Sequence, residues 1–351
     1  MSRAALNGRR AAAAVLLAAA SLGLSSCARP AAAATEAGEA DLVVYSSHPE
    51  ELVRVVVAEF RDRTGLSVRL VQAGTGELLR RLRAEADSGR APGESCDVLW
   101  GGEADSLAAN TDLFEPYASP EAAAVSPEGR AADASWTGFS VLPMVIVYNR
   151  RLLPERDAPS GWAELLEPRF AGRIAYADPA SSGSAYTILR TATLALARAG
   201  RGSATASFAR ALSGRVLPES SQVVPAVASG EYLVGLSFEN AAAETMAAGS
   251  DLGVVYPADG TSAVPDGVAV VRGSGRREAA VRFVDFVLGP DVARVLSGRF
   301  GRRSARGDLP PPTGLPPLSS LELLPYDIAA AARGKAALVE EFRLELSRAA
   351  D

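Results

Sequence analysis

Residues 41–102 decide the fold, and they read DLVVYSSHPEELVRVVVAEFRDRTGLSVRLVQAGTGELLRRLRAEADSGRAPGESCDVLWGG. Three apolar runs in this stretch, 42–45, 67–73 and 97–100, predict β-strands. Between them, residues 49–64 place Leu52, Val56 and Phe60 at helical spacing, and residues 77–88 predict a second, charged helix. Strands that alternate with helices are typical of a parallel sheet covered on both faces. We therefore expect an α/β fold.

The rest of the chain continues this alternation. We expect further helices at 103–110, 162–166, 185–199, 240–248 and 276–288, and strands at 173–177, 231–238, 252–256 and 268–271. Two helices, at 321–334 and 336–350, are expected to close the chain. The apolar run 136–149 contains Pro143 and is long for a simple connection, so we expect it to pass between two lobes. Ligands bind beyond the carboxyl ends of parallel strands, which predicts a cleft site between those lobes.

Composition narrows the classes of function. The 351 residues carry a formal net charge of −5, and no basic run follows the extreme N-terminus, which argues against nucleic acid as a partner. The chain has a single histidine and no G-x-S-x-G elbow, P-loop, H-E-x-x-H motif or Cys/His cluster. We therefore expect no enzyme activity, no metal site and no cofactor. A secreted hydrolase is the alternative from another class.

The first 27 residues predict export. Arg3, Arg9 and Arg10 precede the apolar stretch 11–24, which suits the core of a signal peptide and is too short to span a bilayer. The stretch ends in Leu24-Ser-Ser-Cys27, which resembles the lipobox of bacterial lipoproteins. We expect a signal peptide at 1–26, a lipidated Cys27 that anchors the protein outside the cytoplasm, and a flexible tether at 27–40. An ordinary signal peptide with a chance cysteine is the alternative.

Polar side chains follow the predicted strands where helices begin. Ser47 and Glu50 fit the capping box S-x-x-E, and Thr75 can cap the next helix. Two glycines follow Trp100, and the segment 181–184 sets three serines and a glycine before a long helix. Hydroxyls and unpaired amides at helix N-termini form anion sites. Four such corners together predict a shared site for a phosphate or phosphonate, although each corner alone is better explained as an ordinary N-cap.

A carboxylate follows the strand at 231–238. Glu239 could bind a sugar hydroxyl or an ammonium group, or it could simply pair with a helix dipole on the surface. Asp259 and Asp266 could contribute in the same way, and His48 is expected to cap or pack rather than bind. The candidate ligand-binding residues are Ser46, Ser47, Thr75, Trp100, Ser181, Ser182, Ser184, Phe238 and Glu239.

Several stretches together resemble a known family. They are VYSSHPEE at 44–51, QAGTGE at 72–77, DVLWGG at 97–102, WTGF at 136–139, VIVYN at 145–149, YADPASSGSAYT at 176–187 and TSAVPDG at 261–267. From about Asp41 to the C-terminal helices, the chain resembles the extracellular solute-binding proteins of ABC importers. It is most similar to the branch that contains ferric-iron and hexose-phosphate or aminoalkylphosphonate receptors.

The resemblance implies a type II periplasmic-binding-protein fold, with two lobes, parallel-dominated sheets and an interlobe cleft. It places the crossings near 139–143 and 256–265, so that 41–140 plus 264–351 form lobe I and 141–263 form lobe II. It also implies that the lobes close on a solute and deliver it to ABC permease subunits, with the receptor acting as a monomer. A sensor that presents its solute to a membrane receptor is a further alternative.

The resemblance bears on the ligand as well. Ferric-binding members use an adjacent tyrosine pair late in lobe II, and Phe238-Glu239 stands at the corresponding place here. We therefore expect a small phosphorylated or phosphonate solute, a hexose phosphate or an aminoalkylphosphonate, with a ferric or other metal receptor as the alternative. Ser47, Thr75, Ser182 and Ser184 would hold the oxyanion, Glu239 would hold a hydroxyl or amine, and Trp100 would form a wall.

Overall fold

The computed structural model describes residues 40–349. The chain divides into Met1–Glu39 and Ala40–Asp351, and only the second unit is considered below. The expected signal peptide, Cys27 and nearly all of the expected tether lie outside the described residues. No helix among the described residues is long and apolar enough to cross a bilayer.

The first part of the fold has the predicted alternation of strands and helices. Strand β1 (Leu42–Ser46) pairs in parallel with β2 (Val68–Gln72) on one side and with β3 (Val98–Glu103) on the other. Helix α1 (Glu50–Thr64) buries Leu52, Val56 and Phe60, which confirms the predicted stripe, and it ends at Gly65 with a φ of 74°. Helices α2 (Thr75–Asp87) and α3 (Ala104–Ala108) follow β2 and β3.

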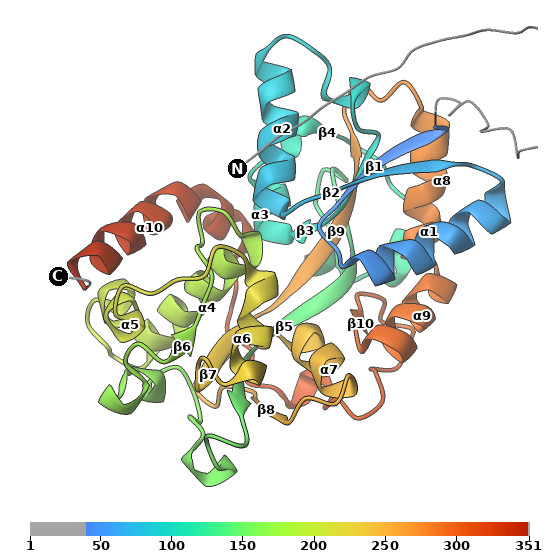
Figure 1. Ribbon diagram of the computed structural model, residues 1–351. Coiled ribbons are helices and arrows are strands. Elements are labelled where there is room, and N and C mark those ends of the chain that lie inside the picture. Colours follow the sequence, from blue (N-terminus) through green and yellow to red (C-terminus); the bar gives the residue numbers. More distant parts are fainter. Residues whose placement is uncertain (1–39, 350–351) are drawn as a thin grey trace, which may run out of the picture. The chain divides into compact units, whose positions relative to one another are not determined.

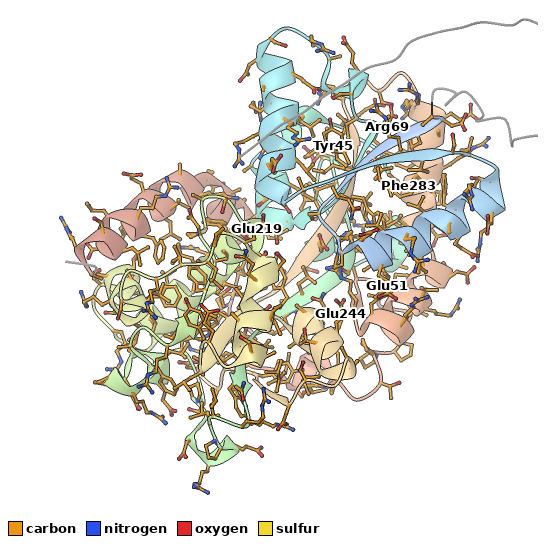
Figure 2. All side chains as sticks on the ribbon, in the orientation of Figure 1. Tyr45, Glu51, Arg69, Glu219, Glu244 and Phe283 are labelled. Atoms are coloured by element: carbon orange, nitrogen blue, oxygen red, sulfur yellow. The ribbon has the colours of Figure 1, made fainter. Side chains whose placement is uncertain are left out.

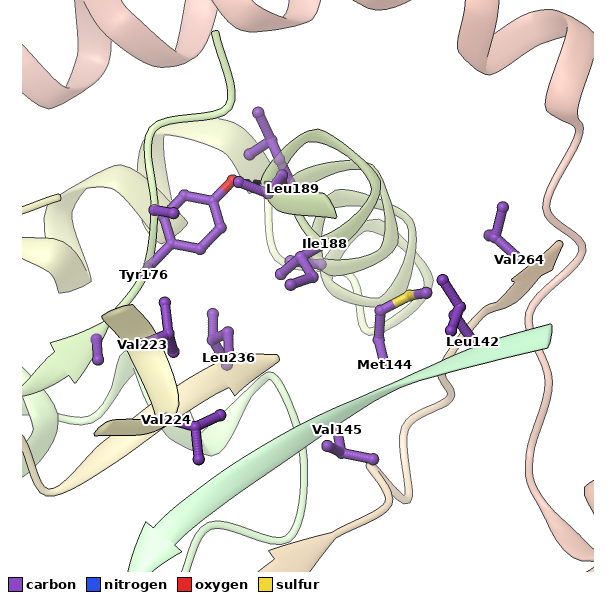
Figure 3. Close-up of a cluster of buried hydrophobic side chains, with 14 of the residues drawn as sticks. Leu142, Met144, Val145, Tyr176, Ile188, Leu189, Val223, Val224, Leu236 and Val264 are labelled. Atoms are coloured by element: carbon purple, nitrogen blue, oxygen red, sulfur yellow. Dashed lines mark hydrogen bonds between the residues drawn. The ribbon is translucent and has the colours of Figure 1, made fainter. Parts of the chain in front are cut away.

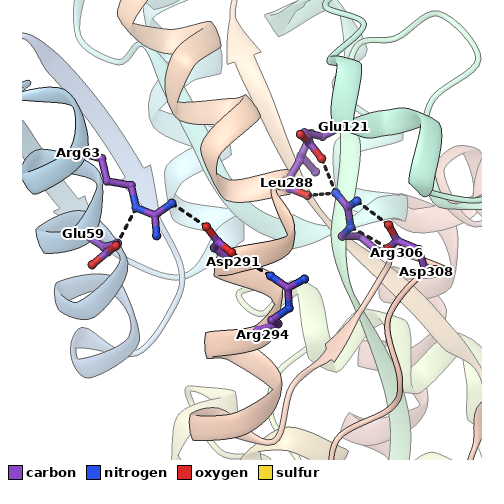
Figure 4. A network of polar contacts seen from close by, with 8 residues as sticks. All are labelled: Glu59, Arg63, Glu121, Leu288, Asp291, Arg294, Arg306 and Asp308. Carbon is purple, nitrogen blue, oxygen red and sulfur yellow. Dashed lines mark hydrogen bonds and ion pairs between the residues drawn. The ribbon is translucent and has the colours of Figure 1, made fainter.

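Later segments complete this part of the fold. Strand β9 (Ala263–Val271) runs antiparallel to β3, and its C-terminal end also pairs antiparallel with the short strand β4 (Phe114–Glu115). Helices α8 (Arg277–Leu288) and α9 (Pro290–Phe300) follow, and then the short strand β10 (Arg303–Ser304). Arg63 of α1 joins α9 through Asp291, while Arg306 binds Glu121, Asp308 and the carbonyl of Leu288 (Figure 4).

A single strand connects the two halves. Strand β5 (Thr137–Asn149) pairs with β9 and β10 through residues 137–143, and with β7 (Val234–Phe238) and β8 (Leu252–Val255) through residues 144–149. Figure 1 shows β5 running through both halves, and Pro143 lies where its pairing partners change. A proline removes a ladder donor and is tolerated at such a junction better than within continuous pairing. The sheet is therefore mixed, with parallel outer strands and antiparallel pairing at its centre.

The second half surrounds β7. Strand β6 (Ile174–Ala175) pairs with β7 in parallel, and α4 (Gly183–Arg198), α5 (Ala204–Leu212), α6 (Val223–Ser229) and α7 (Glu239–Ala247) complete it. Its core includes Met144 and Val145 of β5, Ile188 and Leu189 of α4, and Leu236 of β7 (Figure 3). We call β1–β4, β9, β10, α1–α3, α8 and α9 lobe I, and β6–β8 with α4–α7 lobe II. The lobe boundaries at 140/141 and 263/264 stay a prediction.

The C-terminal segment differs from the prediction. One continuous helix, α10 (Ile328–Arg348), replaces the two expected helices, and Asp327 caps it by accepting the N–H of Ala330 at 2.8 Å. A Cβ at Gly334 would meet nothing within 4 Å, so this glycine sits inside the helix without a packing reason. The helix packs against α5, α3 and α4, and that burial outweighs the weak helix propensity of one glycine.

Other elements were missed. Helices α5, α6 and α9 were not predicted, and α2 begins two residues before the predicted helix. Short 3-10 turns lie at Pro92–Glu94, Thr111–Leu113, Pro120–Ala124, Pro127–Gly129, Glu155–Asp157, Glu164–Leu166, Pro168–Phe170, Ser220–Gln222 and Leu318–Ser320. Helices α5 and α6 are only nine and seven residues long, and segments of that length show too few periods to stand out from a loop.

Candidate functional site: the seam between the two lobes

The corner after β1 is packed rather than open. Ser46 is fully buried, and its hydroxyl accepts the N–H of His48 at 3.3 Å. Helix α1 has Pro49 as its N-cap and no side-chain capping bond, so the predicted capping box of Ser47 and Glu50 is wrong. A Cβ placed on Gly101 would lie 2.6 Å from the Ser47 hydroxyl oxygen, which shows that Ser47 lies against the next corner instead.

The corner after β3 depends on its two glycines. Gly101 and Gly102 have φ values of 114° and 110°, a region that residues with a side chain avoid. A Cβ on Gly102 would lie 2.8 Å from the methyl group of Thr75. Trp100 is fully buried with its ring 4.9 Å from that of His48 and 5.6 Å from that of Phe283. Trp100 thus packs in the core of lobe I.

Corners from the two lobes meet. A Cβ placed on Gly76, in the first turn of α2, would lie 2.9 Å from the backbone carbonyl oxygen of Ser181 in lobe II. A Cβ on Gly183, at the start of α4, would lie 2.3 Å from the Glu103 Oε2 of lobe I. Two glycines therefore allow the lobes to touch at two points. Thr75 and Ser182 consequently border the same seam.

The start of α4 carries a chain of hydroxyls. Ser182 is the N-cap and accepts the N–H of Ala185 at 3.2 Å. The Ser182 and Ser184 hydroxyl oxygens are 3.2 Å apart, and Ser184 donates to Ser220 at 3.1 Å. Thr75 was expected to cap α2, but the N-cap is Gly74 without a side-chain bond. Ser181 is exposed and donates to the carbonyls of Asp178 and Pro218.

Charged side chains form the floor of the seam. Arg302, 5 % exposed, contacts Asp266 at 3.1 Å and the Nδ1 of His48 at 3.2 Å. Asp266 of β9 pairs in register with Glu103 of β3 and with Ser140 of β5. These side chains come from five separate segments, and they meet because β9 lies between β3 and β5.

Burial shifts the pKa values of the titratable side chains at the floor. It raises the pKa of Glu103 to about 8, with Asp105 and Asp266 adding to the effect. Burial also raises the pKa of Asp266, against the attraction of Arg302. Burial, and then the Arg302 guanidinium, hold the pKa of His48 well below its usual range. His48 is therefore neutral at pH 7 and Glu103 is largely protonated.

Polar atoms without partners concentrate near the seam. Among residues 40–349, the buried side-chain atoms without a hydrogen-bond partner are His48 Nε2, Trp100 Nε1, Glu103 Oε2, Ser140 Oγ, Asn240 Oδ1, Glu244 Oε1, Ser262 Oγ and Arg302 Nε. Glu244, on α7, interacts electrostatically with Arg302 and Glu51, and Figure 2 shows Glu51 and Glu244 on facing helices. Buried polar groups are normally satisfied, so Glu103 Oε2 and Arg302 Nε at the floor are candidates for contact with a polar atom of a solute.

A second polar contact joins the lobes beside α10. Asp105 of α3 is fully buried and accepts hydrogen bonds from Thr187 of α4 at 2.8 Å and from Tyr326 at 2.5 Å. Lys335 of α10 donates to Ser106 of α3 at 3.0 Å, and its Nζ lies 4.8 Å from the ring centre of Tyr186 in α4. The C-terminal helix is thus bonded to both lobes.

Glu239 is already occupied. Arg303 binds its carboxylate with two bonds, of 2.6 and 2.8 Å, and Tyr256 donates a third of 2.5 Å. The side chains of Glu239 and Arg303 are 2 % and 3 % exposed. Phe238 is the half-buried N-cap of α7. The Glu239–Arg303 ion pair therefore joins the end of β7 to β10. Neither Phe238 nor Glu239 has a side-chain polar atom left to bind a solute.

Open hollows lie elsewhere. One of about 480 Å³ lies between α7, α9 and the loop at 309–313, and one of about 260 Å³ lies beside the end of α10. No seryl or threonyl hydroxyl of the four corners lines either hollow. At the seam, the corners of the two lobes are in contact at Gly76 and at Gly183.

Comparison with known proteins identifies the class. Residues 96–314 match the family described as bacterial extracellular solute-binding protein. The chain belongs to this family. It is a solute-binding receptor of the kind that serves ABC importers, and the family acts outside the cytoplasm. Solute binding, rather than catalysis, is thus the activity of its class.

Relatives carry different solute names. The iron uptake protein A1 of Synechocystis sp. is 29 % identical over 295 residues, which are 76 % of each chain. The putative 2-aminoethylphosphonate-binding periplasmic protein of Salmonella typhi is 23 % identical, with 72 % and 73 % of the chains covered. The names of relatives therefore leave the solute open between iron and phosphorus compounds.

Solved structures confirm the expected fold class. The fructose-6-phosphate-bound periplasmic binding protein AfuA from Actinobacillus pleuropneumoniae superposes with a TM-score of 0.78 at 22 % identity, covering 87 % of this chain and 98 % of that one. Iron-bound HitA from Pseudomonas aeruginosa gives 0.73 at 20 % identity, covering 86 % and 98 %. Both are periplasmic binding proteins, so the likeness establishes the two-lobed fold.

Sequence reasoning found the hydroxyl corners but missed the floor. Arg302, Glu103 and Lys335 were not singled out, and Asp266 was given only a minor part. No local motif marks them, since Glu103 and Arg302 are 199 positions apart. The one available signal was the rarity of lysine, because Lys335 is the only lysine in the chain.

Proposed function

We propose that the seam between the lobes is the binding site for a small phosphorylated or phosphonate solute, which the receptor delivers to an ABC permease. The observation that carries the proposal is the approach of Gly76 to Ser181 and of Gly183 to Glu103. It brings the corner at Thr75 and the hydroxyls of α4 to one place. Separation of the lobes would open that place to solutes, and closure would bury the solute between them.

The oxyanion end belongs at the start of α4. Gly183 and Ser184 are its first residues, whose N–H groups have no acceptor within the helix. The hydroxyls of Ser182 and Ser184 lie beside them, and Thr75 lies next to Gly76, which contacts Ser181 from lobe I. A 16-residue helix adds the positive end of its dipole. Ser47 stands behind this corner against Gly101.

The other end of the solute belongs on the floor. Glu103, as the neutral acid, would bind a hydroxyl of a sugar, and the Asp266 carboxylate would bind a hydroxyl or the amine of an aminophosphonate. We assign this role to them in place of Glu239, because Arg303 and Tyr256 already occupy Glu239. Trp100 has no contact role in this scheme, since it packs inside lobe I. Attachment to the membrane through a lipidated Cys27 completes the proposal.

A ferric receptor is the second candidate, and the names of several relatives favour it. Phe238 and Glu239 stand where the resemblance places the tyrosine pair of ferric-binding members. The phenolate oxygens of such a pair stabilise ferric iron strongly, and a phenyl ring with an arginine-bound carboxylate does not replace them. We therefore rank a phosphorus-containing solute first.

A thermal-shift screen tests the proposal. Fructose 6-phosphate, 2-aminoethylphosphonate, inorganic phosphate and ferric citrate are added separately to the purified protein. A solute at 100 times its Kd stabilises the folded state by about 2.7 kcal/mol. We expect fructose 6-phosphate or 2-aminoethylphosphonate to raise the melting temperature most.

Variants locate the effect. Ser182→Ala combined with Ser184→Ala should abolish the shift, while Ser88→Ala, an exposed serine at the end of α2, should retain it. A shift with ferric citrate alone, accompanied by visible absorbance from bound iron, would support the second candidate instead. A shift that persists in the double variant would place the solute elsewhere.

A further inference from the structure

One carboxyl group is buried by the contact between the lobes. Glu103 ends β3 in lobe I and is 5 % exposed. Its Oε2 has no hydrogen-bond partner among the described residues and lies against Gly183 of lobe II, where an added Cβ would be only 2.3 Å away. Separation of the lobes would remove α4 from this carboxyl and return it to water.

The surroundings of Glu103 are mostly acidic. Asp105 acts on it from α3 and Asp266 from β9, and both raise its pKa, while Lys335 from α10 lowers it. Arg302 pairs with Asp266 and with His48 rather than with Glu103. From α4 the contacting residue is Gly183 at the helix N-terminus, whose partial positive charge opposes the effect of burial but is smaller than that of a cationic side chain. Closure therefore takes the carboxyl out of water without bringing it a cationic side chain from α4.

We propose that closure of the two lobes takes up one proton from solvent at Glu103, so that mildly acidic conditions favour the closed receptor and alkaline conditions favour the open one. The proton binds a carboxylate oxygen of Glu103 and forms the neutral acid. The inference rests on the proposed cleft, whose solute it leaves unspecified. It gives the receptor a built-in dependence of solute capture on external pH.

The sign follows from proton linkage. The carboxyl has an ordinary pKa of 4.5 in water, and burial, with Asp105 and Asp266 beside it, raises the pKa to about 8 in the closed form. Between these values the closed form holds one more proton than the open form. The closed-to-open ratio should therefore fall up to about tenfold for each unit of rising pH, and level off above pH 8.

Small-angle X-ray scattering of the solute-free protein measures the predicted change. The radius of gyration should increase between pH 5.5 and pH 9. Glu103→Gln, which mimics the neutral acid, should stay compact at pH 9. Glu278→Gln, on an exposed turn of α8 with its side chain 82 % exposed, should behave as the wild type. A radius that is constant across this range in the wild type overturns the proposal, as does an unchanged pH response in Glu103→Gln.

Calorimetry provides an independent count. Titrations with 2-aminoethylphosphonate and with fructose 6-phosphate at pH 7, in buffers of different ionisation enthalpy, give the protons taken up on binding. On binding, the wild type should take up as much as one proton more than Glu103→Gln does. Protons that the solute itself gains or loses contribute equally to both proteins and cancel in the subtraction. Equal uptake overturns the proton linkage while leaving the cleft intact. Failure of both solutes to bind counts against the proposed function alone, since the scattering experiment needs no solute.

Discussion

Replacement of Gly76 by alanine tests whether closure depends on the contact between the lobes. The new methyl carbon would lie 2.9 Å from the backbone carbonyl oxygen of Ser181 and 3.5 Å from its carbonyl carbon. A backbone atom cannot rotate away as a side chain can. Overpacking of this kind costs about 1–3 kcal/mol, which should weaken solute binding about 5-fold to 150-fold.

The free protein should respond differently, because its lobes can separate and avoid the overlap. Gly76 lies in the first turn of α2, where alanine favours the helix by about 0.5–1 kcal/mol. The melting temperature without solute should therefore be unchanged or slightly raised. Calorimetric titration with 2-aminoethylphosphonate or fructose 6-phosphate gives the affinity, and thermal unfolding gives the stability.

Gly298→Ala is the matched control, since a Cβ at Gly298 of α9 would meet nothing within 4 Å. It should leave affinity within about twofold of the wild type. Wild-type affinity in Gly76→Ala would refute the reasoning, because it would mean that the solute-bound lobes do not bring Gly76 against Ser181. The reasoning would also be refuted if Gly76→Ala lowered the free energy of unfolding of the solute-free protein by as much as it lowered the free energy of binding. The overlap would then exist without solute as well.

Three further predictions concern the supports of the site. Arg303→Met should lower the free energy of unfolding by about 3–5 kcal/mol in urea titrations, because it leaves the Glu239 carboxylate buried without its cation; a loss below 1 kcal/mol would contradict the assignment. His48 stays neutral when folded because burial and Arg302 depress its pKa, so the unfolded chain gains a proton first as the pH falls. Its contribution to stability should therefore decline below pH 6.5 by up to about 1.4 kcal/mol per pH unit, and His48→Gln should remove that component of the slope. Burial raises the pKa of the Cys96 thiol, so in a Cys27→Ser variant Cys96 should resist a disulfide reagent until denaturant is added; rapid labelling of the folded protein would disprove its burial.

The sequence predicted the alternating elements of lobe I well because their signals are local. The spacing of Leu52, Val56 and Phe60 fixed the buried face of α1, and Gly65 marked its end. The same local reasoning failed at Ser47, whose spacing from Glu50 fits a capping box. The tight packing of Ser47 against Gly101 decides its position instead, and that contact depends on the neighbouring strand.

The hydroxyl corners could be predicted because each one follows a strand directly. The floor could not, because the meeting of Glu103 with Asp266 depends on antiparallel pairing between β3 and β9, which lie 160 positions apart at their closest ends. Glu239 looked available in the sequence since its partner Arg303 is distant. Trp100 looked like a pocket wall because its packing partner Phe283 is also distant in the sequence. In the structure, α8 places Phe283 against Trp100, so that Trp100 is part of the core.

A crystal structure with bound solute tests the central claim most directly. The protein would be crystallised with whichever of fructose 6-phosphate and 2-aminoethylphosphonate raises its melting temperature more. We expect the phosphorus-bound oxygens within hydrogen-bonding distance of Ser182, Ser184 and Thr75, with residues of both lobes around the solute. Density for the solute in the hollow between α7 and α9, with the seam empty, would contradict the account.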